Sequence, residues 1–206
     1  MKTGKNNPKI GIIIQARNGA KRLPNKMIAK IEEKTLLEHV INRLKHSKYS
    51  NNLVLATTEK DEDKILIEVA RNLNILTLSG AGEDVLLRFV QVLNKFDFDI
   101  IVRVCGDNAL IEPNEIDKMI AYLIENNLDY INNFHENGLP TGAGAEVLTK
   151  EALFKEDKLT NDAFDREHVT WFIRNHPELF KTFSLDAPKE LINTKLKFAV
   201  DTKEDL

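Results

Sequence analysis

A short basic loop near the start of the chain has the residue types that bind an anion. It follows the apolar run Ile12–Ile14 and carries four cations within ten residues, namely Arg17, Lys21, Arg22 and Lys26. Ligands of open α/β sheets bind at the carboxyl ends of strands, and a polyphosphate suits this density of positive charge. A solvated basic turn is the alternative interpretation.

Two aspartates could supply carboxylates to the same place. Asp107 follows the run 100–106, and Asp201 follows the run 196–200. If both runs are parallel strands, both carboxylates face the crevice of the basic loop, and beside a polyphosphate they suit Mg²⁺. Taken alone, Asp107 is equally well explained as a turn residue and Asp201 as a helix cap. The combination with the basic loop favours a metal site.

The composition restricts the classes of function. A net charge of −3 argues against a nucleic-acid binder, which needs a broad basic field. The single cysteine, Cys105, permits no internal disulfide, residues 1–8 are polar, and no apolar run is long enough to span a membrane. We therefore expect a cytoplasmic protein that binds neither nucleic acid nor membranes, with the basic loop as a local exception.

Segments of strand length alternate with helical stripes in the first part of the chain. The expected strands are 9–15, 53–57, 75–78 and 100–104, and the expected helices are 36–44, 65–73, 85–93 and 113–123. Within the last of these strands, Arg103 is the one charged residue. This alternation predicts an α/β, Rossmann-like domain of three layers, with a mainly parallel central sheet and helices on both faces.

The pattern is less regular after residue 128. Short strands are expected at 129–132, 180–185 and 196–200 and, at a sheet edge, at 146–148; a helix is expected at 165–175. The stretch 135–145 contains three glycines and a proline, which predicts a loop. Without a linker or a repeat, we expect residues 1–206 to form a single domain with a nucleotide-binding-like half, 9–128, and a second half, 129–206.

Five motifs lie in order along this sequence. They are the basic loop, 83–89, Gly106-Asp107, 165–170 and 200–206. Together they resemble the cytidylyltransferases of the spore-coat polysaccharide SpsF type, relatives of the CMP-KDO and CMP-sialic acid synthetases. The resemblance extends over 9–206. It implies a nucleotide-diphospho-sugar transferase (GT-A-like) fold, nucleotidyl transfer from CTP and a homodimer, with 129–206 binding the acceptor and completing the metal site.

The resemblance also implies roles for individual residues. Asp107 and Asp201 match the aspartates that bind Mg²⁺, and Arg17, Lys26 and Asp107 are the expected catalytic residues. The implied nucleotide contacts are Gln15, Ala16, Arg17, Arg22, Lys26, Asp84, Arg88 and Asp107. The implied contacts to the acceptor sugar are Glu146, Arg166 and His168.

The implied reaction fits these residue types. A hydroxyl or phosphate of the acceptor attacks the α-phosphorus of CTP, and pyrophosphate leaves in line. Such a transfer needs positioning and charge neutralisation and no activated nucleophile, so we expect Cys105 to be a buried strand residue. His168 has two interpretations: it binds the acceptor or accepts its proton, or it is a structural residue near a helix start.

Two departures from the family pattern leave the acceptor open. Ala109 stands where relatives have a proline, and Gly144 stands where many have an acidic residue. Three functions are therefore considered. The first is CMP transfer to a sugar or acidic keto-sugar for a surface polysaccharide, and the second is a pyrophosphorylase acting on a sugar or alditol phosphate. The third is a GT-A-like glycosyltransferase or nucleotide-sugar-binding protein without nucleotidyl transfer. Relatives continue beyond the position of Leu206, so the chain is a short member or a truncated one.

Overall fold

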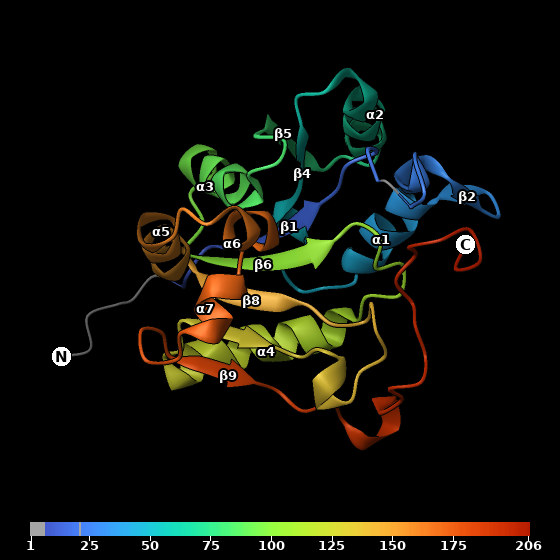
Figure 1. Cartoon of the computed structure of the whole chain (residues 1–206). Helices are drawn as coiled ribbons and strands as arrows, with labels where there is room; N and C mark the ends of the chain where they lie inside the picture. Colours follow the sequence, from blue (N-terminus) through green and yellow to red (C-terminus); the bar gives the residue numbers. More distant parts are fainter. Residues whose placement is uncertain (1–6, 21) are drawn as a thin grey trace.

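A seven-stranded sheet forms the centre of the computed structural model, which describes residues 7–20 and 22–206 (Figure 1). The strand order is β5-β4-β1-β6-β8-β7-β9. The strands are β1 (Ile10–Gln15), β4 (Leu53–Thr58), β5 (Leu76–Gly80), β6 (Ile100–Cys105), β7 (Tyr130–Asn132), β8 (Glu146–Thr149) and β9 (Thr182–Ser184). A separate hairpin pairs β2 (Lys30–Ile31) with β3 (Lys34–Thr35).

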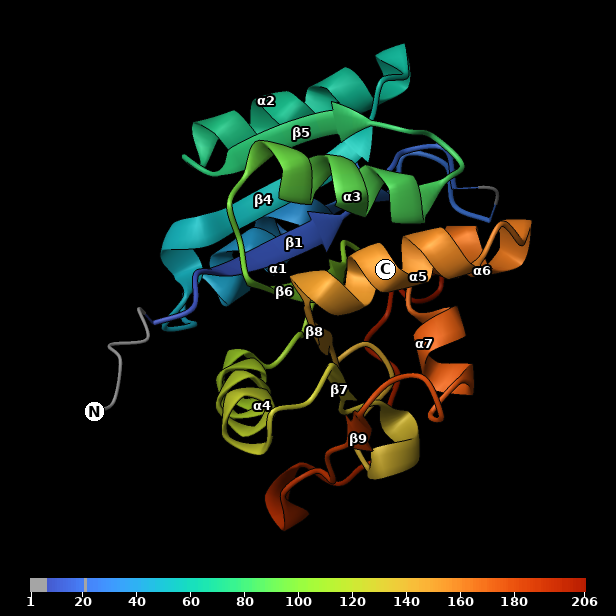
Figure 2. The ribbon, with the colours of Figure 1, turned by 90° about the vertical axis from the view of Figure 1, so that its left-hand side faces the viewer.

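Helices cover both faces of this sheet, as Figure 2 shows with α3 in front of β1 and α1 behind it. One face packs against α1 (Leu36–Leu44), α2 (Lys64–Asn72) and α4 (Pro113–Asn126), and the other against α3 (Val85–Lys95), α5 (Lys150–Leu159) and α7 (Trp171–Asn175). The alternation within β1 explains this arrangement, because Ile12 and Ile14 enter one core and Ile13 enters the other. The three-layer α/β prediction is confirmed.

Shorter helical segments connect these layers. Helix α6 (Ala163–His168) lies between α5 and α7. The 3₁₀ segments are η1 (Lys26–Ile28), η2 (Ser50–Asn52), η3 (Asp61–Asp63), η4 (His135–Asn137) and η5 (Lys189–Leu191). Within residues 7–20 and 22–206, no helix combines the length and the apolarity needed to cross a membrane.

The sheet is parallel except around β8. Strand β1 pairs in parallel with β4 and β6, whereas β8 runs antiparallel to both β6 and β7. The expectation of an edge strand at 146–148 is therefore wrong. Val147 and Leu148 explain the inner position, because each is fully buried in the core of a different face.

Two further expectations in the second half are wrong. The run 196–200 forms only isolated bridges, Asn108 with Ala199 and Thr141 with Lys197, because it packs against loops instead of a strand. The helix expected at 165–175 is split into α6 and α7. Val169 lies between them with φ 51°, a conformation that a right-handed helix cannot contain.

Candidate active site

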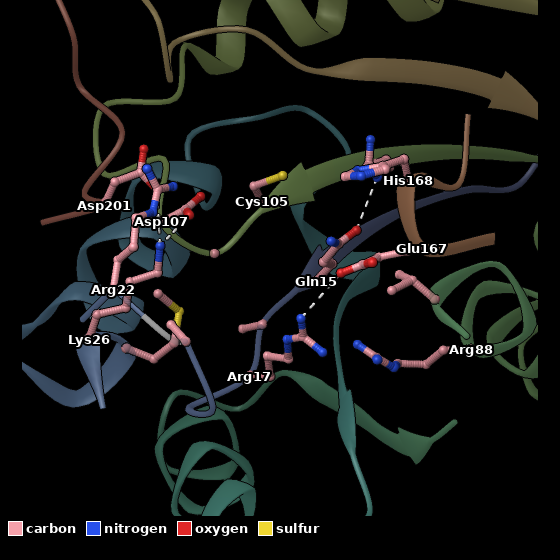
Figure 3. A pocket seen from close by; sticks show the side chains of 16 residues that line it. Gln15, Arg17, Arg22, Lys26, Arg88, Cys105, Asp107, Glu167, His168 and Asp201 are labelled. Atoms are coloured by element: carbon pink, nitrogen blue, oxygen red, sulfur yellow. Dashed lines mark hydrogen bonds and ion pairs between the residues drawn. The ribbon is translucent and has the colours of Figure 1, made fainter. Parts of the chain in front are cut away.

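A cavity of about 360 Å³ opens at the carboxyl ends of β1 and β6 (Figure 3). Most of the residues predicted to bind ligands line it: Gln15, Ala16, Arg17, Arg22, Lys26, Arg88, Asp107, His168 and Asp201. Three others, Asp84, Glu146 and Arg166, do not line it. Lys21 lies outside the described residues. The topology thus brings residues from both halves of the chain to one cavity.

The basic loop is anchored by its own polar residues. Asn18 makes two of the anchoring hydrogen bonds. Its backbone N–H donates to Asp63 at 2.6 Å, and its side-chain amide nitrogen donates to the Glu62 carbonyl at 2.7 Å. The loop returns at Asn25, whose φ of 59° is left-handed and whose N–H donates to the Asn18 carbonyl. These contacts fix the position at which Lys26 begins η1.

Lys26 is the centre of a cluster of opposite charges. Its Nζ lies 2.6 Å from Asp107 Oδ2 and 3.5 Å from Asp201 Oδ1, and donates to the Val200 carbonyl at 2.8 Å. Arg22 Nη2 lies 2.9 Å from the same Asp201 oxygen. Figure 3 shows these four charged side chains together at one end of the cavity. Two cations and two carboxylates therefore neutralise each other at this end.

Asp201 reaches the cavity without a sheet strand. The Val200 N–H donates to the Asp107 carbonyl at 3.0 Å, which ties the two acidic segments together. Asp205 then closes a turn, because its Oδ2 accepts from the backbone N–H groups of Asp201 at 2.9 Å and Thr202 at 2.8 Å. Lys197 forms ion pairs with Asp201 and Asp205. A turn thus does the positioning that a strand was expected to do.

The donor set of this cluster suits a magnesium ion beside phosphates. Asp107 and Asp201 both contact the ammonium group of Lys26, so their carboxylates lie close to each other. Within the described residues, no group of three or more His, Cys, Asp or Glu side chains forms a ready metal site. Mg²⁺ takes one or two carboxylates and completes its octahedron with phosphate oxygens and water. The two aspartates therefore fit an ion that arrives with a polyphosphate.

Arginines line the other end of the cavity. Arg17 lies 2.9 Å from Glu83 and 3.5 Å from Glu167, and the ion pair holds the pKa of Glu83 below its usual value. The buried Arg88 donates to the carbonyls of Ala81 and Gly82. Burial, together with the charge of Arg17, lowers the pKa of Arg88 to about 10. Arg88 therefore shapes the loop before α3 as well as lining the cavity.

Asp84 and Arg166 bind each other. Asp84 caps α3 by accepting from the Leu87 N–H at 2.8 Å, and its other oxygen accepts from Arg166 Nε at 2.7 Å. Arg166 also bonds Asp157 at 2.9 Å and the Thr160 carbonyl at 3.1 Å. These contacts hold α6 against α3 and α5. The structure thus places Arg166 behind the cavity, where it positions the two residues that follow it.

Two of the charged lining residues, Arg103 and Glu167, were absent from the predicted site residues. The signal for Arg103 is present in the sequence, since it is the one charge in the strand expected at 100–104. Cys105 also lines the cavity, and burial raises the pKa of its thiol to about 11. A thiol that remains protonated is a poor nucleophile.

Comparisons with known proteins identify the family. The family model described as cytidylyltransferase matches residues 11–205. The uncharacterized protein MJ1063 of Methanocaldococcus jannaschii is 39% identical, over 94% of this chain and 78% of its own length. The spore coat polysaccharide biosynthesis protein SpsF of Bacillus subtilis is 33% identical, over 94% of this chain and 81% of its own.

A solved structure agrees with this assignment. The cytidylyltransferase from Leptospira borgpetersenii is 31% identical and superposes with a TM-score of 0.91, covering 97% of this chain and 84% of that one. The sheet order and this likeness together show the nucleotide-diphospho-sugar transferase fold. The chain is a nucleotidyltransferase and belongs to the cytidylyltransferase family.

Proposed function

We propose that this enzyme transfers CMP from CTP to a sugar or an acidic keto-sugar in a Mg²⁺-dependent reaction that releases pyrophosphate. The observation that carries the proposal is the cluster of Lys26, Asp107 and Asp201 beside Arg22 at one end of the cavity. The name of the SpsF relative supports a product used for a surface polysaccharide. A cytoplasmic homodimer remains a prediction.

Arg17, Arg22 and Lys26 would bind the triphosphate. Each is paired with a carboxylate that a phosphate could replace, and Arg22 is the most exposed of the three, with 69% of its side chain accessible. When Lys26 turns to a phosphate, Asp107 and Asp201 become free to hold Mg²⁺. Bound there, Mg²⁺ supplies neutralisation of the charge on the phosphate oxygens. The protein itself contributes positioning, and no covalent intermediate is needed.

His168 would face the acceptor. It ends α6, lines the cavity and lies with its ring centroid 4.2 Å from that of Phe164. An imidazole at this position can donate a hydrogen bond to the acceptor or receive the proton of its attacking hydroxyl. Arg17 and Glu167 close the cavity beside it.

Calorimetric titration tests the nucleotide part of the proposal. CTP, UTP, GTP and ATP are titrated with and without Mg²⁺, and CTP is expected to bind most tightly, with an affinity that increases with Mg²⁺. Pyrophosphate release is then screened with nine-carbon keto acids, eight-carbon keto acids and sugar phosphates at fixed CTP. Selective binding of another nucleotide would refute the proposal, and CTP binding without pyrophosphate release for any acceptor would favour a binding protein.

A pyrophosphorylase that uses a sugar or alditol phosphate is the second candidate, and Gly144 favours it. A Cβ at this position would lie 2.5 Å from the Asn133 carbonyl oxygen, so the backbone is too close for any side chain. The acidic group that many relatives carry here is therefore absent, and so is its repulsion of a phosphate. Sugar phosphates in the acceptor screen test this candidate directly.

A further inference from the structure

Arg103 and Glu146 form an ion pair in the middle of the sheet. The register places Arg103 of β6 between Ile13 of β1 and Glu146 of β8. The accessible fraction is only 12% for the Arg103 side chain and 3% for that of Glu146. A buried ion pair is often no more stable than apolar residues of the same volume. Its presence in a strand that is otherwise apolar or cavity-lining therefore points to a role beyond folding.

Both carboxylate oxygens of Glu146 are already bound by buried or partly buried side chains. Its Oε1 accepts from the Tyr130 hydroxyl at 2.7 Å and from the Thr170 hydroxyl, and its Oε2 accepts from Arg103 Nη1. Burial and the Glu146 charge raise the pKa of Tyr130, so this hydroxyl remains a donor. Glu146 lies behind the cavity wall and holds the guanidinium of Arg103 in one orientation.

The guanidinium of Arg103 has an edge that faces the cavity. Its Nε donates to Gln15 Oε1 at 3.0 Å and Nη1 donates to Glu146, while the side chain lines the cavity. Among residues 7–20 and 22–206, none accepts a hydrogen bond from Nη2. Gln15 accepts this bond with its side-chain carbonyl oxygen, and no acceptor within the described residues takes up its amide N–H groups. Arg103 and Gln15 therefore present N–H donors to the cavity.

These donors lie apart from the cluster around Lys26. In Figure 3, Gln15 and His168 lie on one side of the cavity, and Asp107 and Asp201 lie on the other. The ion proposed above and the phosphates bound by Arg22 and Lys26 would occupy the side of the aspartates, with Arg17 reaching the triphosphate from the opposite side. The acceptor, which is the second reactant, would therefore contact Gln15, Arg103 and His168.

We propose that Arg103 binds an oxyanion of the acceptor, a carboxylate or a phosphate, and that Glu146 is the positioning residue that orients Arg103 for this contact. The inference rests on the proposed function and deepens it. A guanidinium fork matches the two oxygens of an oxyanion. Because Glu146 already neutralises Arg103, the geometry of the fork, and not excess charge, provides the selectivity.

The test measures binding of simple probes to the full chain saturated with CTP and Mg²⁺. N-acetylneuraminate and 3-deoxy-manno-octulosonate supply a carboxylate, glucose 1-phosphate supplies a phosphate, and glucose supplies neither. At least one anionic probe is expected to bind about tenfold more tightly than glucose. The probe that binds shows whether the oxyanion is a carboxylate or a phosphate. Equal affinity for glucose, or binding of none of the anionic probes, would overturn the proposal.

Two variants then test the assigned roles. Arg103→Lys keeps the positive charge but loses the planar guanidinium fork. It is expected to lower the affinity for the probe about tenfold, while the affinity for CTP changes less than about twofold. Glu146→Gln is expected to act in the same direction on the probe, again with CTP affinity preserved. Arg43 lies on α1 and pairs with Glu112, so Arg43→Lys is the matched control and should change neither affinity.

The outcomes separate the two proposals. A parallel loss of CTP and probe affinity in Arg103→Lys would indicate a structural role and overturn the inference. Unchanged probe affinity in both variants would overturn it as well. Failure of the wild-type chain to bind CTP would instead refute the proposed function.

Discussion

Two clusters of charge lie around the cavity, an outer one centred on Lys26 and an inner one centred on Glu146. They differ in how exposed their carboxylates are and in how many hydrogen bonds those carboxylates accept. At the outer end, Lys26 contacts Asp107, Asp201 and the Val200 carbonyl, and 22% and 23% of the two carboxylate side chains remain accessible. Glu146, in contrast, is almost inaccessible and accepts three hydrogen bonds from side chains. The outer cluster can exchange its partners for a ligand. The inner cluster is fixed and can only orient what lies in front of it.

The largest expected effect comes from removing one carboxylate of the exchangeable cluster. Asp107→Asn should lower the rate of pyrophosphate release by about 10²–10³-fold, since it removes a charge on which transition-state neutralisation depends. Metal-free CTP binding should be kept, because Lys26 is released from its partner. Pyrophosphate release in the presence of an acceptor measures the first effect and calorimetry the second. A rate within about threefold of wild type would remove Asp107 from the site.

Removing the charge of Glu146 from the inner cluster should lower the free energy of unfolding. Glu146→Leu leaves Arg103 buried without its counter-charge and should cost about 3–5 kcal/mol of unfolding free energy. The double variant with Arg103→Leu should recover a large part of that loss, because neither charge is then buried alone. Urea denaturation measures both. An additive loss in the double variant would show that the two residues do not act as a pair.

The sequence contains clear signals for the structure of the first half of the chain and weak ones for the second half. The strands at 9–15 and 100–104 are mostly apolar runs that are each followed by a helical pattern, so local pattern and tertiary structure agree there. Asp201, in contrast, is positioned by Asp205 and Lys26, and the run before it is no strand. The contact with Lys26 joins residues far apart in sequence, and a contact of that kind leaves no periodic pattern.

The side of the cavity around Arg103 and His168 shows the same limit. The break at Val169 depends on its backbone conformation between two packed helices, and helix α5 was missed because it buries only Ala152, Leu153 and Glu156. Arg103 was visible as an anomaly in the sequence, but its meaning required the partner strand β8. A charge in an apolar strand is thus a signal for a site whose partner has yet to be found.

A fourth carboxylate, Glu156 on α5, extends the comparison because it is fully buried. Burial raises its pKa to about 9, so the folded protein keeps this proton at neutral pH whereas the unfolded chain releases it near its ordinary value. Stability should therefore fall as the pH rises from about 4.5 to about 9. Glu156→Gln should remove this slope and add about 3 kcal/mol of unfolding free energy near pH 7.

Urea denaturation of the two proteins at several pH values checks this expectation. The curves should meet below about pH 4.5, where the carboxyl group is protonated in both states. Parallel curves over the whole range would contradict it.

The smallest expected effect concerns the turn that carries Asp201. Asp205→Ala removes the acceptor for two backbone N–H groups and should weaken Mg²⁺-dependent CTP binding roughly tenfold. Metal-free CTP binding should not change, and calorimetry with and without Mg²⁺ separates the two. Asp61→Ala, at an exposed pair with Lys64, is the control. Equal losses with and without Mg²⁺ would mean that the turn merely supports the fold.

The reversed direction of β8 has a consequence for how such enzymes diversify. A parallel strand contributes the loop that follows it to the carboxyl edge of a sheet, whereas an antiparallel strand contributes the loop that precedes it. Because Glu146 begins β8 opposite Arg103, the residues 133–145 and the segment after Cys105 emerge at the same edge. Insertions or exchanges in 133–145 can therefore change what lies at this edge of the sheet while β1, β6 and β8 keep their register.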